Sequence, residues 1–183
     1  MKKQTILQLS DIACCLPYGL KVQSKEDGKI FILCGLNSET DIIRMKSQNF
    51  TWSESIHAIQ PLLRPMSDLY KPCLEDGKIP IVELAKLEIS GSRRYGTPQF
   101  GYEVCENAWG QKWLKYNPYL MHGAFGFSFC HISKSFKKHE CRDDKACEVS
   151  DQYLLFQKIC EWHFDINGLI ERKLAIDINT IKI

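Results

Sequence analysis

Cysteine and histidine are the side chains of this sequence best suited to chemistry, and the chain has nine cysteines and five histidines among 183 residues. Thiolates and imidazoles are ligands that zinc prefers, and a thiol beside an imidazole makes a nucleophile with its base. Two groups of these residues stand close enough together in the sequence to suggest a site.

The first group has the composition of a zinc site. Its members are Cys130, His131, His139, Cys141 and Cys147. A segment rich in glycine and without helical periodicity would gain stability from a bound metal ion. Structural zinc sites, however, favour cysteine pairs separated by about two to four residues, and this segment has no such pair. The spacing therefore favours unrelated packing residues, with a zinc site as the alternative.

The second group is Cys160, His163 and Asp165. A helix expected over residues 151–164 places Cys160 and His163 at an i, i+3 spacing on one face. The two could form a thiolate–imidazole pair oriented by Asp165, or half of a metal site. Because one helical pair of this kind arises easily by chance, we favour two residues of the buried helix face and expect no catalytic residue.

An alternation of aromatic residues at 125–129 (FGFSF) predicts a β-strand. On an open sheet such a strand stacks its rings on nucleic-acid bases. The lysines that follow are balanced by acidic residues, and the net charge of the chain is only +2. Base stacking by Phe125 and Phe127 is therefore an alternative to the favoured interpretation, in which the Phe face lies in the core.

Residues 91–97 have the glycine spacing of a phosphate-binding loop, but the loop lacks its lysine and a proline follows where a helix should begin. We therefore interpret Arg93, Arg94 and Tyr95 as an exposed loop that offers a contact surface to a partner.

The elements that position these residues begin with a hairpin. Asp27-Gly28 separates two β-type segments, 20–24 and 29–34, and predicts a tight turn between antiparallel strands. A third strand is expected around residues 55–59. The adjacent Cys14 and Cys15 are expected at the end of a short helix that begins near residue 5.

Two longer helices are expected, at 80–87 with proline in its first turn and at 151–164 with apolar residues at helical spacing. The fold class is therefore α+β, a small antiparallel sheet packed by these helices within one domain, residues 1–183. Residues 90–148 carry many glycines and no helical periodicity, and we interpret them as a variable, loop-rich insertion with short strands.

The composition excludes some classes of protein. The 24 basic and 22 acidic residues give no basic excess for nucleic-acid binding. No segment is apolar over the length of a membrane span, and polar residues interrupt the start of the chain where a signal peptide would be apolar. A cytoplasmic protein without membrane association is expected, with its cysteines as reduced thiols.

Four segments of the sequence indicate a resemblance to a known family. They are 16–22 (LPYGLKV), 62–69 (LLRPMSDL), 79–87 (IPIVELAKL) and 162–183 (WHFDINGLIERKLAIDINTIKI). Together they resemble a family of small phage and prophage proteins of Bacteroides-type bacteria with no assigned function. The resemblance covers residues 1–88 and 149–183, and it implies a phage or mobile-element origin without supplying site residues.

The expected function is that of a non-enzymatic accessory protein that acts in the bacterial host cytoplasm by binding a protein partner. The favoured partner is a protein of the host. The resemblance, the lack of a catalytic group of residues and the loop-rich segment support this interpretation. The alternatives are a nucleic-acid-binding module and a small Cys/His enzyme. No cofactor is expected, with zinc as the alternative.

Overall fold

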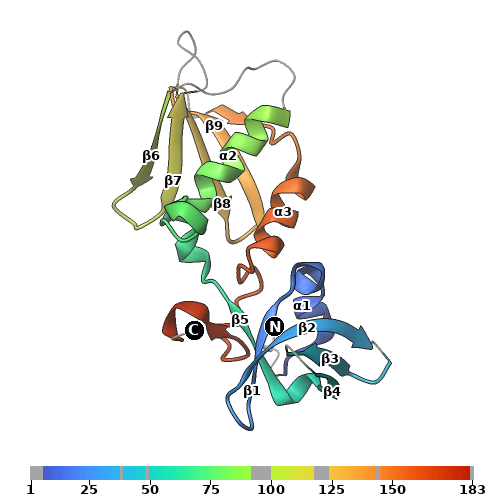
Figure 1. Cartoon of the computed structure of the whole chain (residues 1–183). Coiled ribbons are helices and arrows are strands. Elements are labelled where there is room, and N and C mark those ends of the chain that lie inside the picture. Colours follow the sequence, from blue (N-terminus) through green and yellow to red (C-terminus); the bar gives the residue numbers. More distant parts are fainter. Residues whose placement is uncertain are drawn as a thin grey trace. The chain divides into compact units, whose positions relative to one another are not determined.

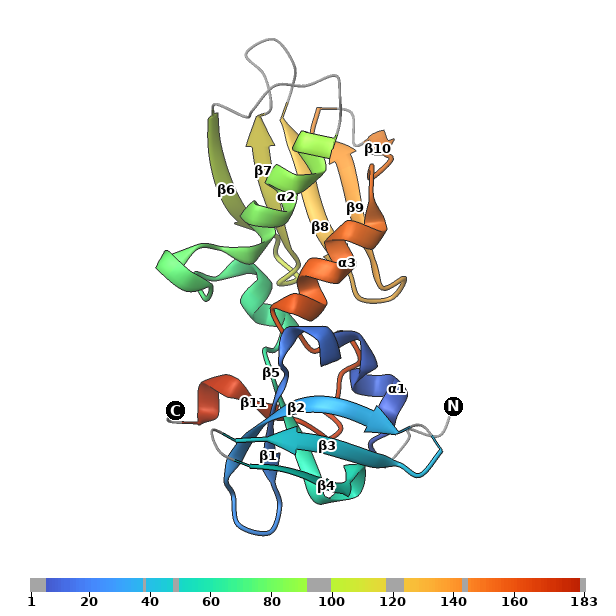
Figure 2. The same ribbon diagram turned by 45° about the vertical axis from the view of Figure 1, so that its right-hand side comes forward.

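The computed structural model describes residues 6–37, 39–47, 50–91, 100–117, 124–142 and 145–181. The chain divides into two compact units, the first made of Met1–Met66 and Ile159–Ile183 and the second of Ser67–Lys158 (Figures 1 and 2). Over the described ranges the units contain two antiparallel-rich sheets and three α-helices, so the predicted α+β class is confirmed. The predicted insertion, 90–148, lies inside the second unit.

The first unit is built on a six-stranded sheet. Its strands are β1 (Lys21–Ser24), β2 (Ile30–Asn37), β3 (Ile42–Lys46), β4 (Thr51–Ser55), β5 (Ile59–Leu63) and β11 (Ile176–Asp177), in the order β11-β5-β1-β2-β3-β4. All neighbours are antiparallel except β11, which runs parallel to β5. The strand from the end of the chain is thus paired with a strand from its first half.

The predicted hairpin is present between β1 and β2, where Gly28 has a φ of +69° that favours glycine. The strand expected at 55–59 is instead a 3-10 turn, η2 (Ile56–Ala58), between β4 and β5. The reason is local capping, because the Ser55 hydroxyl accepts a hydrogen bond from the His57 backbone N–H and bends the chain.

The core of the first unit is mostly aliphatic. Its buried residues are Leu7, Ile12, Cys15, Leu20, Val22, Leu33, Ile43, Met45, Ile56, Ile59, Leu63, Cys160, Leu169 and Ala175. The short helix α1 (Leu9–Ile12) and the 3-10 helix η1 (Ala13–Tyr18) that continues it contribute Ile12 and Cys15 to this core. Gly19, with a φ of +68°, ends η1.

The second unit is built on a five-stranded antiparallel sheet. Its strands are β6 (Phe100–Glu106), β7 (Lys112–Asn117), β8 (Phe125–Cys130), β9 (Ser135–Glu140) and β10 (Lys145–Cys147), in the order β10-β9-β8-β7-β6. The segment expected to be rich in loops therefore supplies a whole sheet. Between β5 and α2 in the sequence, the chain also forms two 3-10 turns, η3 (Met66–Tyr70) and η4 (Glu75–Gly77).

The helices α2 (Pro80–Gly91) and α3 (Gln152–Glu161) cover one face of the second sheet (Figures 1 and 2). Phe156 of α3 packs edge-on against Phe129 and Phe136. The Gln152 side-chain oxygen accepts a hydrogen bond from the Phe136 backbone N–H, and its amide group donates one to the Phe136 carbonyl. Both helices were expected on the first sheet. Instead, their apolar faces pack on the aromatic face of β8 and β9. The hydrophobic periodicity of a helix does not indicate which sheet it packs on.

A buried ionic network joins α2 to the sheet of the second unit. The Glu88 carboxylate accepts hydrogen bonds from Lys138 Nζ at 3.1 Å and from the backbone N–H and hydroxyl of Ser150 at 2.9 and 3.1 Å. No part of the Glu88 side chain is exposed, so these partners replace its lost hydration. Among the helices described here, none is long and apolar enough to cross a membrane.

Candidate metal centre

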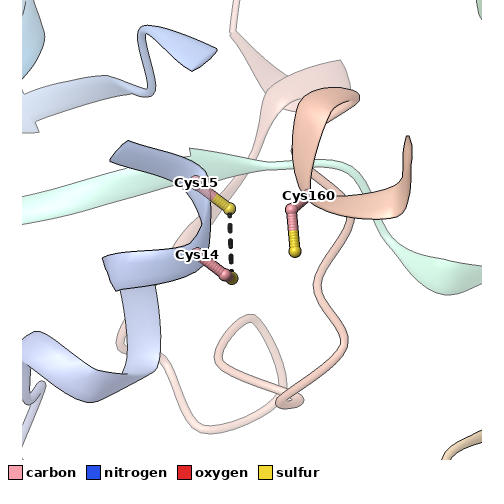
Figure 3. A group of neighbouring side chains, drawn as sticks. All are labelled: Cys14, Cys15 and Cys160. Carbon is pink, nitrogen blue, oxygen red and sulfur yellow. Dashed lines mark hydrogen bonds between the residues drawn. The ribbon is translucent and has the colours of Figure 1, made fainter. Parts of the chain in front are cut away.

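Three cysteines converge in the first unit (Figure 3). Cys14 and Cys15 lie on η1, and Cys160 lies in the last turn of α3. The three Sγ atoms lie within 4.8 Å of one another, and those of Cys14 and Cys15 are 3.7 Å apart. Across the described ranges, this is the one group of three thiol, imidazole or carboxylate side chains that comes so close together.

The end of α3 fixes the position of Cys160. The His163 backbone N–H bonds the Cys160 carbonyl at 3.1 Å, and the Phe164 N–H bonds the Ile159 carbonyl at 3.0 Å. This is a Schellman motif with His163 in the left-handed conformation, at a φ of +57°. The helix therefore ends with a defined turn one residue beyond Trp162.

The backbone after the helix is held just as firmly. The Arg64 N–H donates to the His163 carbonyl and the Asp165 N–H donates to the Arg64 carbonyl, both at 2.8 Å. Arg64 directly follows β5, so the sheet of the first unit carries the segment that bears His163. Cys14 and Cys15 reach the same region from η1, where Cys15 is anchored in the aliphatic core.

The three thiols shift one another's pKa values in different directions. Hydrogen bonds from Cys15 and then from Cys160 lower the pKa of Cys14. The same contacts with Cys14 raise the pKa of both Cys15 and Cys160. These contacts therefore favour the thiolate form of the exposed Cys14 and the protonated form of the two buried cysteines.

The separations within the group could accommodate a metal ion. Thiolates bound to zinc at about 2.3 Å in a tetrahedron are separated by roughly 3.8 Å. The 3.7 Å between the Cys14 and Cys15 sulfurs already matches that separation. The cluster could thus hold a metal ion without a large rearrangement, and three sulfur donors favour thiophilic metals such as zinc over magnesium or calcium.

Of the predicted triad, Cys160 and His163 lie in this region but Asp165 does not orient the imidazole. The two Asp165 carboxylate oxygens accept hydrogen bonds from the Leu169 and Ile170 backbone N–H groups, each at 2.8 Å. Asp165 is buried and organises the turn that follows it. The Cys160 sulfur contacts the two other cysteines, so the group is not arranged as a nucleophile, base and orienter.

The structure does not bring the other predicted zinc ligands together. In the register of β8 and β9, Cys130 pairs with Ser135 whereas His139 pairs with Gly126, which places Cys130 and His139 about 13 Å apart along the strand. Cys147 pairs with Lys138 and therefore points to the face opposite His139. The ring of His139 lies directly over Gly126, where any Cβ would collide with it.

The remaining members of that group are placed as follows. His131 lies in the turn after β8 with its ring edge-on to Phe129, and Cys141 is exposed just beyond the other end of β9. The hairpin therefore separates Cys130 and His131 from His139 and Cys141.

The predicted binding residues are also separated. Arg93, Arg94 and Tyr95 lie outside the described residues. Phe127 is fully buried and stacks on Phe136 with ring centroids 5.4 Å apart, so it has no free face for a base. Phe125 is half-buried against Tyr116.

No protein-family model, curated protein or solved structure matches this chain. The functional conclusions therefore rest on its side chains. Two features of the structure were not anticipated. One is the cysteine cluster. Cys160 was expected as part of half a metal site, but the sequence did not indicate Cys14 and Cys15 as the partners of Cys160. The other is Trp109, which is 85% exposed.

Proposed function

We propose that this protein is a non-enzymatic accessory protein of a phage or mobile element, which binds a protein partner in the bacterial cytoplasm. The observation that carries the proposal is the 85% exposure of Trp109 on the turn between β6 and β7. Tryptophan is strongly enriched among the residues that dominate the energy of protein interfaces, and an exposed indole gains from being buried in a partner.

The turn that presents Trp109 is well organised. The Asn107 side-chain oxygen accepts the backbone N–H groups of Trp109 and Gln111 at 3.0 and 2.9 Å, and its amide donates to the Gln111 side chain at 2.8 Å. Gly110 supplies the positive φ of +75° that closes the turn. A side chain on such a preformed turn loses little backbone entropy on binding.

A second exposed apolar side chain lies on a turn next to the one that presents Trp109. Ile132, which is 98% exposed, lies in the turn between β8 and β9. In an antiparallel sheet ordered β9-β8-β7-β6, this turn and the β6–β7 turn lie at the same end of the sheet (Figure 2). Because neighbouring strands are about 4.8 Å apart, the two turns are separated by roughly 10 Å. Two apolar anchors at this spacing favour a protein partner with a hydrophobic surface or pocket over a nucleic acid.

The test compares full-length wild-type protein with Trp109→Ala and with Tyr153→Ala, an exposed aromatic residue on α3 of the same unit as control. A host protein captured by the wild type is identified, purified and titrated by calorimetry. We expect Tyr153→Ala to bind like the wild type and Trp109→Ala to bind about 30-fold more weakly, as for an interface hot spot. Equal affinity of all three forms would refute a role for Trp109.

The two alternative functions have less support. Base stacking by Phe127 would require a ring that now packs against Phe136. Catalysis by Cys160 would require a reactive thiolate, but this thiol is buried and contact with Cys14 raises its pKa.

We propose in addition that the cysteine cluster holds a structural zinc ion. Three soft donors from two remote segments support this, because a shared metal ion would tie η1 to the end of α3. The test is the zinc content of protein prepared under reducing conditions with zinc present. We expect one zinc per wild-type chain and per Cys34→Ser chain, in which the exposed thiol on β2 is changed, and none with Cys160→Ser. Failure of the wild type to retain zinc would refute the site.

A further inference from the structure

Cys14 differs from the two other cysteines of the cluster in its access to solvent. Its side chain is exposed, whereas Cys15 and Cys160 are buried. A small oxidant in solution therefore reaches the Cys14 sulfur first. Cysteines that respond to oxidants are characteristically accessible to solvent and lie next to a second cysteine, which reacts with the first oxidation product. Two sulfurs lie within 4.8 Å of that of Cys14, so there are two candidates for this second cysteine.

Cys15 is poorly placed to form a disulfide with Cys14, although the two sulfurs are 3.7 Å apart. Consecutive Cα atoms across a trans peptide are about 3.8 Å apart, which is less than the roughly 4.4–6.8 Å found in most disulfides. Both residues also lie in the 3-10 helix η1, whose backbone would have to distort. Cys15 is in addition part of the aliphatic core, so packing opposes its movement.

Cys160 has neither of the first two restrictions. It lies in the last turn of α3, and its sulfur is close to those of η1 (Figure 3). Because Cys14 and Cys160 are far apart in the sequence, no small ring constrains a bond between them. A disulfide requires sulfurs about 2 Å apart, and rotation about the Cα–Cβ bonds of the two side chains can close a gap of at most 4.8 Å without moving the helices.

We infer that Cys14 and Cys160 form a reversible redox pair that responds to hydrogen peroxide. In the first step, the Cys14 sulfur attacks one peroxide oxygen. An S–O bond forms and the O–O bond breaks, so that Cys14 becomes a sulfenic acid and one water molecule leaves. In the second step, the Cys160 sulfur attacks the Cys14 sulfur, the S–S bond forms, and the hydroxyl group leaves as water with the Cys160 proton. The two thiols together lose two electrons and two protons, and the peroxide is reduced to two water molecules.

The disulfide connects the two segments that the cluster brings together, η1 and the end of α3. In a reducing cytoplasm such a bond is transient, because small thiols reverse it by exchange, and this is typical of redox-sensing disulfides. If the cluster also holds zinc, oxidation consumes two of the three sulfur ligands and releases the ion. Only this release rests on the zinc proposal, since the disulfide follows from the positions of the sulfurs.

The test treats full-length protein, reduced and then freed of reductant, with hydrogen peroxide. Remaining thiols are alkylated, and trypsin then places Cys14 and Cys160 on separate peptides, 4–21 and 159–172. Mass spectrometry detects a link between these peptides, and fragmentation distinguishes Cys14 from Cys15. A chromogenic chelator measures any zinc released. Cys34→Ser is the matched control, because Cys34 is also exposed but lies on β2 outside the cluster.

We expect the linked peptides to be the main oxidation product of the wild type and of Cys34→Ser, and to disappear after treatment with dithiothreitol. In Cys160→Ala the link should be lost, and Cys14 should be oxidised further to a sulfinic acid. A link between Cys14 and Cys15 in the wild type would overturn the inference. Oxidation of Cys14 without any link, and to no greater extent than that of Cys34, would also overturn it.

The redox pair and the zinc site can fail separately. A link between Cys14 and Cys160 in wild-type protein that holds no zinc would refute the zinc proposal and support the redox pair. Wild-type protein that keeps its zinc in peroxide and forms no link would overturn the redox pair and leave the zinc site.

Discussion

The two units of this chain are built around different cores. The first buries aliphatic side chains together with Cys15 and Cys160, and it needs both ends of the chain, since β11 pairs with β5. The second is continuous in sequence and is built on hairpins with an aromatic core, in which Phe136 contacts both Phe127 and Phe129. One unit is thus assembled from remote segments and the other from neighbouring ones.

This difference explains where a metal ion would be useful. Bringing remote segments together costs more loop-closure entropy than forming successive hairpins. The cysteine cluster lies where η1 meets the end of α3, so a metal ion there would offset part of that cost. The second unit has its buried Glu88–Lys138 pair and aromatic packing instead, and should not depend on a metal ion.

The largest expected effect is that of metal removal on the first unit alone. Structural zinc ions contribute on the order of 10 kcal/mol or more to the folding of small domains. We expect chelation of the zinc-loaded protein to abolish the hydrogen-exchange protection of β5 and β1 while β7, β8 and β9 retain theirs. If both sheets lost protection equally, or if neither lost any, the proposal that only the first unit depends on the metal ion would be contradicted.

The next largest effect concerns the second unit. Glu88→Ala leaves Lys138, whose side chain is only 14% exposed, without its buried partner, and we expect a loss of about 3–5 kcal/mol in the unfolding free energy of this unit. Urea denaturation followed by hydrogen exchange measures it. Glu83→Ala on the same helix removes a half-exposed pair with Lys86 and should cost about 0.5 kcal/mol or less. Similar losses in the two variants would show that the Glu88 network is not a principal support.

A smaller effect is expected at His163, whose backbone is left-handed at a φ of +57°. His163→Gly relieves this conformation and should stabilise the first unit by about 1 kcal/mol. Thermal unfolding of the wild type and the variant measures the change, and a loss of stability in His163→Gly would show that the imidazole supports the fold.

The smallest effect on stability is expected at Trp109. Because this side chain is 85% exposed, Trp109→Ala should change the unfolding free energy by no more than about 0.5 kcal/mol. Urea denaturation provides the check. A loss above about 2 kcal/mol would mean that the indole supports the fold and would weaken its assignment to partner binding.

The sequence predicts the parts of this fold that local chemistry determines. Asp27-Gly28 has the composition of a hairpin turn, and Pro80 begins a helix, as expected for a residue without a backbone N–H. The strand at 125–129 follows from its alternation. Periodicity does not specify which sheet a helix packs on, so both helices were expected on the sheet of the first unit. Residues 90–148 were expected to hold loops and short strands, and the pairing of these strands into one five-stranded sheet was not predicted.

The candidate site was the least predictable part. Spacing rules look for ligands close together in the sequence, and they drew attention to Cys130, His131, His139 and Cys141, which the β8–β9 register keeps apart. Cys14 and Cys15 meet Cys160 only because the chain ends share one unit.

Native mass spectrometry of the full chain, prepared under reducing conditions with zinc present, tests the central claim most directly. A mass with one zinc ion for the wild type, and a bare mass for Cys160→Ser, is the expected result. A bare mass for the wild type would contradict a metal centre at Cys14, Cys15 and Cys160 and leave these residues as packing side chains of the first unit.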